Sequence, residues 1–228
     1  HGGRTYALED CTPNVVEMCE ELLKKSHFIV LKLSPMLDWH RAVEQLRGVM
    51  EVHVVSVGGE CKELLLVLGH VEEPLTLFCC NDNVTFSCPA NFNIPVPLCD
   101  SEPAEGQYLL VPDASIMKAG CFAAVALRFS LRQVDTNSHL YVSDKPAEKY
   151  PGRQFLIRSV TNMNKNELRR ALYGITQANV AVRNFPLTAV ALQRRLKLKD
   201  GGNIYIFATT VCGRHLLFLT SPLAANLC

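Results

Sequence analysis

The chain has 228 residues, 48% of them hydrophobic, and a formal net charge of +1. This length allows two or three small domains, and no apolar run reaches the ~20 residues that a membrane-spanning helix needs. The near-zero overall charge is the sum of two opposite charges. Residues 1–150 carry a net −8 and residues 151–228 a net +9. The C-terminal excess of positive charge suits a polyanion such as RNA or DNA or, alternatively, an acidic part of the same chain.

The first predicted helix begins at Thr12-Pro13, where a hydroxyl cap precedes a proline at the first helical position. Apolar residues then recur at helical spacing as far as Lys24-Lys25, whose charges suit the end of a helix. Residues 27–33 form an almost unbroken apolar run. Such a run is typical of a strand that is buried on both faces of a parallel sheet.

A second helix is predicted to begin after Asp38 and to end at Gly48. Two strands, at 52–57 and 61–68, then flank the turn Gly58-Gly59. The order helix, strand, helix, strand, strand predicts that residues 1–70 are the closing half of a doubly wound α/β sheet. We expect the first half of that sheet to lie outside this chain.

Residues 71–150 are predicted to be a middle region of hairpins and a helix. Six prolines interrupt residues 71–112, with short β-type pieces at 75–80 and 83–87. Residues 114–134 have helical character that Gly120 interrupts. A polar connection then leads to Pro151-Gly152, where we expect a domain boundary.

Residues 151–228 predict a small α+β domain with the element order βαβαββ. Its first helix begins at the cap Asn164, and its second helix is expected over residues 188–198. Its strands are expected at residues 154–160, 178–185, 203–211 and 214–220. The crossovers of about a dozen residues indicate a ferredoxin-like arrangement, in which both helices cover one face of the sheet.

The basic residues of this domain concentrate on its two helices, at positions that the apolar pattern leaves to the solvent. A face of this kind can follow a phosphate backbone, so these residues are the candidate RNA-binding set. The set is Lys165, Arg169, Arg170, Arg183, Arg194, Arg195, Lys197 and Lys199. Tyr205 and Phe207 alternate on a strand, where they are suited either to stack bases or to fill the core.

Ligands of open α/β sheets bind beyond the carboxyl ends of the strands. Asp10, Lys32, Ser34 and Asp38 are therefore the candidates to face a substrate. For Asp38 the alternative is a plain helix cap, and for Lys32 it is a side chain that extends from a strand end into solvent. The sequence identifies no catalytic residue.

Ten cysteines are present, several of them in apolar stretches. Buried, reduced thiols are typical of cytoplasmic proteins, whereas secreted proteins pair them as disulfides. Cys79, Cys80, Cys88 and Cys99 lie close in sequence, but no pair has the short C-x₂₋₄-C spacing of a zinc site. We therefore expect a cytoplasmic protein with no metal site.

Several stretches, such as LKLSPMLD at 31–38 and RLKLKDGG at 195–202, together resemble one family. The others are residues 2–13, 51–57, 60–65, 113–122, 137–141, 151–153, 182–187 and 205–210. In these stretches the chain resembles bacterial class I S-adenosylmethionine-dependent methyltransferases that carry a C-terminal THUMP-like domain. The resemblance covers nearly the whole chain.

The resemblance implies that the chain is the C-terminal part of such an enzyme. The Gly-rich loop, the acidic strand end and the Asp-Pro pair of the methyl-donor site would all precede His1. S-adenosylmethionine is then the cofactor of the parent protein, structured RNA (tRNA or rRNA) is its partner, and this fragment is inactive alone. The residues by themselves leave an alternative, a non-catalytic ferredoxin-like module that binds a protein or a small molecule.

Overall fold

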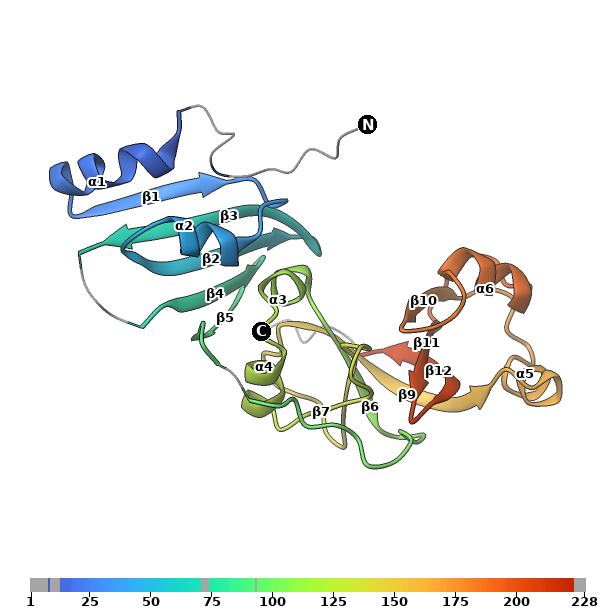
Figure 1. Ribbon diagram of the computed structural model, residues 1–228. Coiled ribbons are helices and arrows are strands. Elements are labelled where there is room, and N and C mark those ends of the chain that lie inside the picture. Colours follow the sequence, from blue (N-terminus) through green and yellow to red (C-terminus); the bar gives the residue numbers. More distant parts are fainter. Residues whose placement is uncertain (1–7, 9–12, 71–73, 93, 224–228) are drawn as a thin grey trace. The chain divides into compact units, whose positions relative to one another are not determined.

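The computed structural model describes residues 8, 13–70, 74–92 and 94–223 (Figure 1). The chain forms two compact units. The first comprises His1–Asn93 and Asp113–Cys121, and the second comprises Ile94–Pro112 and Phe122–Cys228. These limits differ from the expected segments 1–70, 71–150 and 151–228, because the middle region contributes strands and helices to both units.

The first unit contains a five-stranded sheet in the order β1-β3-β2-β4-β5. Its elements are α1 (Val15–Lys25), β1 (Phe28–Leu33), α2 (Trp39–Gln45), β2 (Val49–Val57), β3 (Glu60–Gly69), β4 (Thr76–Asn81), β5 (Val84–Pro89) and α3 (Ala114–Ala119). Strand β3 is antiparallel to both β1 and β2, so β1 and β2 run parallel to each other with α2 in their crossover. Strand β4 adds in parallel to β2, and β5 completes a hairpin.

The core of the first sheet lies on the face that α3 covers. Val52 and Val54 of β2 and Leu64 and Leu66 of β3 alternate onto this face, and all four are 0% exposed. Full burial of such a side chain contributes about 1.5–3 kcal/mol.

The strand predicted at 27–33 forms as β1, but the expectation that it is buried on both faces is wrong. Phe28 is 60% exposed and Val30 is 64% exposed. Strand β1 lies at the edge of the sheet, where β3 is its one partner among the strands that the structure describes. Because side chains alternate along a strand, Phe28 and Val30 share the face that remains open.

The first helix begins later than predicted. Its cap is Asn14, whose Oδ1 accepts the backbone N–H of Val16 at 3.2 Å. The predicted cap Thr12 lies outside the described residues. Asparagine caps a helix as well as a hydroxyl residue does, and the helical pattern alone does not separate the two positions.

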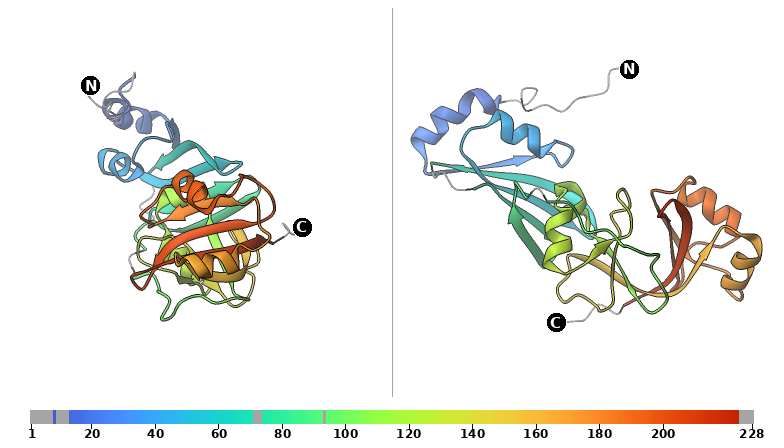
Figure 2. Two further views of the ribbon diagram at one scale, coloured as in Figure 1. Left: turned by 90° about the vertical axis from the view of Figure 1, so that its right-hand side faces the viewer. Right: turned by 60° about the horizontal axis from the view of Figure 1, so that its bottom comes forward.

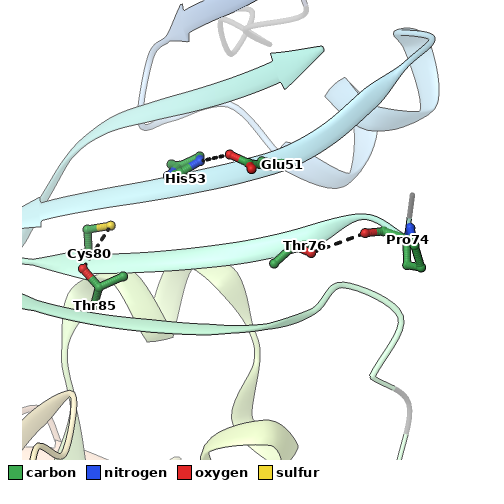
Figure 3. Close-up of polar contacts among 6 residues, drawn as sticks. All are labelled: Glu51, His53, Pro74, Thr76, Cys80 and Thr85. Atoms are coloured by element: carbon green, nitrogen blue, oxygen red, sulfur yellow. Dashed lines mark hydrogen bonds and ion pairs between the residues drawn. The ribbon is translucent and has the colours of Figure 1, made fainter. Parts of the chain in front are cut away.

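The hairpin predicted at 75–87 also forms, and it extends the first sheet. Figure 3 shows the polar contacts near β2, β4 and β5: Glu51 with His53 at 2.7 Å, Thr76 with the carbonyl of Pro74, and Thr85 with Cys80. The His53 ring also stacks on Phe78 of β4, with ring centres 4.5 Å apart. These contacts link neighbouring positions on the strands.

The second unit contains a seven-stranded sheet in the order β10-β11-β12-β9-β6-β8-β7. Its elements are β6 (Tyr108–Pro112), α4 (Phe122–Arg128), β7 (Arg132–Gln133), β8 (Tyr141–Ser143), β9 (Gly152–Asn162), α5 (Lys165–Ala171), β10 (Asn179–Arg183), α6 (Ala189–Leu196), β11 (Tyr205–Val211) and β12 (Arg214–Pro222). The long strand β9 pairs with β12 on one side and with β6 on the other.

The predicted βαβαββ order is present from β9 to β12. Helices α5 and α6 pack on one face of these strands, over a core that includes Leu192, Leu196 and Leu217. Both helices lie on the near side of the sheet in the left view of Figure 2. The opposite face has its own core, which includes Phe155 and Phe218.

The helix predicted over 114–134 is wrong in its length. The chain forms two short helices, α3 and α4, and then the strand β7. Gly120 ends α3 in the left-handed conformation, with φ +74°, which glycine adopts without the steric cost that a side chain brings.

Candidate nucleic-acid interface

Helices α5 and α6 are held by side-chain caps and by apolar contacts on their inner faces. Asn164 Oδ1 accepts the N–H of Asn166 at 2.9 Å, and Thr188 Oγ1 accepts the N–H of Ala191 at 3.2 Å. Leu192 of α6 is 0% exposed, whereas α5 has no fully buried residue. The side of each helix that packs on the core fixes its rotation and leaves the basic positions facing solvent.

Seven of the eight candidate RNA-binding residues lie on these helices or directly after α6. They are Lys165, Arg169, Arg170, Arg194, Arg195, Lys197 and Lys199, and all are exposed. In the described part of the chain, none of the seven forms an ion pair. The seven side chains together are called the helical basic face below.

Arg183 does not belong to this face. Val180 and Val182 of β10 pack with the core under α5 and α6, whereas Ala181 packs with the opposite core. Arg183 follows Val182 on the strand, so it points away from the two helices. It lies near His139 instead, where burial and the charge of Arg183 lower the pKa of the imidazole.

Tyr205 and Phe207 were each suited either to stack bases or to fill the core, and the structure places them differently. Phe207 is 5% exposed and packs against Phe155 with ring centres 4.8 Å apart, so it belongs to the core. Tyr205 is partly exposed, and the Arg153 guanidinium lies 4.7 Å from the centre of its ring. The Tyr205 ring is therefore already in a cation–π contact.

The candidates at the carboxyl ends of the first strands make local contacts. The Lys32 ammonium pairs with Glu63 at 2.6 Å, and Ser34 Oγ accepts the N–H of Met36 at 3.3 Å. Asp38 caps α2, because its Oδ1 accepts the N–H of His40 at 3.0 Å. Asp10 lies outside the described residues.

The hydrogen bonds at Asp38 also set its charge state. Burial raises the pKa of this carboxyl, but the hydrogen bonds and the charge of His40 outweigh burial and hold the pKa below its ordinary value. Asp38 is thus a charged helix cap at neutral pH.

The second unit contains a cavity of about 460 Å³ that the sequence does not predict. It is lined by Phe129, Ser130, Arg132, Val142, Ser143, Asp144, Lys145, Pro146 and Ala147. The sequence pattern assigned this stretch to a long helix and a polar connection, so it did not predict facing walls. No motif marks these residues, and their adjacency depends on the pairing of β7 with β8.

The described cysteines are free thiols, and several are buried. Cys79 Sγ and Cys121 Sγ lie 3.6 Å apart, and burial raises the pKa of Cys99 to about 11. Among the residues with assigned positions, no group of three His, Cys, Asp or Glu side chains could hold a metal ion.

Comparisons with known proteins identify two consecutive segments of the chain. The family described as THUMP domain-like matches residues 152–222, and a ferredoxin-like domain matches residues 108–151. The ferredoxin-like match therefore lies just before the segment for which that arrangement was expected. No curated protein matches the chain.

One solved structure is similar to nearly the whole chain. It is described as a putative methyltransferase from Porphyromonas gingivalis W83, with 32% identity and a TM-score of 0.87. The match covers 96% of this chain and 57% of that chain, so this chain spans a little over half the length of its relative.

These matches agree with the resemblance found in the sequence. The chain contains a THUMP-like domain and is structurally related to a putative methyltransferase. No helix in the described residues is long and apolar enough to cross a membrane.

Proposed function

We propose that this chain is the C-terminal part of an S-adenosylmethionine-dependent methyltransferase that acts on RNA. In this proposal the helical basic face grips the phosphate backbone of a structured RNA, such as tRNA or rRNA. The grip would place the target nucleotide against the catalytic sheet, because methyl transfer depends mainly on positioning donor and acceptor. The protein is proposed to act in the cytoplasm.

The observation that carries the proposal is the set of exposed cations without ion pairs. Arg169, Arg170, Arg194 and Arg195 lie in the last turns of α5 and α6, where each cation can stabilise the helix by about 0.3–1 kcal/mol. Helix stability therefore accounts for part of the pattern. It does not account for Lys165, which begins α5, because the helix dipole opposes a cation there.

The relation to a methyltransferase supports the reaction. The first sheet contains the parallel strands β1 and β2 joined through α2, which is the connection expected in a doubly wound sheet. Its open edge strand β1 carries exposed apolar side chains on one face, and the solved relative has chain beyond the part that matches. Both observations support a longer sheet in the parent protein.

The described candidates at the carboxyl ends of the first strands are engaged by neighbouring groups. Lys32 is paired with Glu63, Ser34 with Met36, and Asp38 with His40. These three side chains therefore form no donor-binding set by themselves. We place most of the donor site in the upstream part of the parent protein.

The test is a titration of labelled tRNA and rRNA hairpins with this chain over a range of salt concentrations. The charge-neutralised variants are Arg169→Gln/Arg170→Gln and Arg194→Gln/Arg195→Gln. We expect each pair to weaken binding of all the hairpins and to lower the salt slope by about 0.7–0.9 for every phosphate contact that is lost.

A matched control is Lys24→Gln/Lys25→Gln, since these two exposed cations also lie in the last turn of a helix, α1. The control removes the same charge and should leave RNA affinity nearly unchanged. If the chain binds no RNA at low salt, the proposal is wrong and the alternative gains support, a non-catalytic module for a protein or a small molecule.

A further inference from the structure

The cavity between the end of α4 and strands β7 and β8 has walls that are fixed before any ligand binds. The Gln154 side chain accepts the N–H of Ala147 at 2.8 Å and donates to its carbonyl at 2.7 Å. Gln107 Nε2 donates to Asp144 Oδ1 at 2.8 Å, and Ser143 Oγ accepts the N–H of Lys145 at 3.2 Å. Four hydrogen bonds thus hold the loop over residues 143–147.

The apolar part of the cavity is an aromatic surface. Phe129 lines it together with Val142, which is 2% exposed, and Pro146. The Phe129 ring is held edge-on by Tyr150, with ring centres 5.5 Å apart and an angle of 74°. A fixed aromatic ring beside aliphatic side chains suits a flat heterocyclic ligand.

The polar part of the cavity combines two cations with one acceptor. Arg132 and Lys145 are both exposed, and neither forms an ion pair with any residue that has an assigned position. Asp144 uses Oδ1 for Gln107, so its carboxylate retains accepting capacity at Oδ2. Two hydroxyl groups, of Ser130 and Ser143, add further donors.

We propose that this cavity binds a nucleoside monophosphate unit. The phosphate would bind Arg132 and Lys145, the base would lie on Phe129, and an exocyclic amino group of the base would donate to Asp144. Arginine and lysine are the usual partners of phosphate, and the volume of about 460 Å³ lies within the range of small-molecule sites. This site is separate from the helical basic face and does not depend on its binding RNA.

Two sources supply this chemistry, a free mononucleotide and the 5′-phosphorylated end of an RNA. The first arm of the test is calorimetry of the whole chain with AMP, CMP, GMP and UMP, and with adenosine. We expect a Kd of about 10 μM to 1 mM for AMP, and binding of adenosine that is at least about tenfold weaker. The second arm compares a short RNA with a 5′-phosphate and the same RNA with a 5′-hydroxyl.

The decisive variant is Arg132→Met/Lys145→Met, which removes both charges and keeps the aliphatic stems. It should weaken AMP binding by at least about tenfold and leave adenosine binding unchanged. Arg128→Met/Lys149→Met is the matched control, since both residues are exposed cations close in sequence to the cavity but do not line it. Its affinity for AMP should stay within about twofold of the wild type.

The possible results distinguish the two ligand sources from each other and from the absence of a site. A 5′-phosphate preference that the decisive variant loses supports the site and identifies RNA ends as the source, whereas binding of mononucleotides alone supports it with a free nucleotide as the source. The inference is overturned if AMP binds no more tightly than adenosine, or if the decisive variant binds AMP like the wild type. Neither result bears on the charge-neutralised variants of α5 and α6, so the two proposals can fail independently.

Discussion

At the scale of single residues, the contacts of a side chain decide between a structural and a functional role. Asp38 was a candidate to face a substrate, and its carboxylate caps the N-terminus of α2 through His40. Lys32 was a second candidate, and it is engaged by Glu63 on the neighbouring strand. Local hydrogen bonds and ion pairs thus account for both residues.

The capping role of Asp38 can be measured. We expect Asp38→Ala to lower the free energy of unfolding by about 1 kcal/mol, because the N–H of His40 loses its acceptor. Asp38→Asn keeps a capping oxygen and should retain most of the stability. Urea denaturation of the three proteins measures the difference, and an alanine variant as stable as the wild type would show that the cap contributes nothing.

At the scale of elements, edge strand β1 differs from the central strands. Its partner β3 carries fully buried leucines, whereas Phe28 and Val30 of β1 are largely exposed. An edge strand with apolar side chains presents a surface on which another strand or helix can pack. This is the element at which the parent sheet is proposed to continue.

Substitutions in β1 and β3 should therefore differ in cost. Val30→Thr should change the free energy of unfolding of this chain by less than about 0.5 kcal/mol, since the side chain is 64% exposed. Leu64→Ala, at a residue that is 0% exposed, should cost about 2–5 kcal/mol.

The same comparison in a longer protein tests the half-sheet. If further strands cover β1 there, Val30→Thr should cost more in the longer protein than in this chain. Chemical denaturation of both proteins measures the two costs. Equal, small costs in both would contradict a sheet that continues at β1.

At the scale of the whole molecule, acidic and basic residues are separated along the chain. Residues 151–228 contain Glu167 and Asp200 as their acidic residues against eleven Lys and Arg. The Arg214–Glu102 pair, at 2.6 Å, joins this segment to an acid upstream within the second unit. The helical basic face itself has no such partner in the described residues, so its charge remains available to a polyanion.

The division of the proposed enzyme also predicts how this chain treats the methyl donor. We expect no measurable affinity for S-adenosylmethionine, with any Kd above about 1 mM, because the donor-binding strands are proposed to lie upstream. Isothermal titration calorimetry of the chain with the donor is the measurement. Micromolar binding would place the donor site within this chain and contradict the division.

Much of the fold follows from local patterns. The strand before Ser34, the turn Gly58-Gly59 and the caps Asp38 and Asn164 lie where the sequence predicts them. Each depends on residues close in sequence, namely an apolar run, a pair of glycines or a capping side chain next to a helix.

The sequence predicted only part of the candidate site. The exposure of the basic residues on α5 and α6 follows from helical periodicity, which assigns inner and outer positions without knowledge of the partner strands. The position of Arg183 does not, because it depends on which face of β10 receives the helices. The cavity at Phe129 depends on the pairing of β7 with β8 and was not predicted.

The sequence by itself determined the order of elements from β9 to β12 and the separation of charge, since both are properties of residues along the chain. Only the tertiary structure decided that β4 and β5 extend the first sheet, that β1 is an open edge and that Arg183 lies apart from the other cations. These features arise from pairings between strands distant in sequence. Strand periodicity shows which residues share a face, but it does not show which strand or helix that face meets.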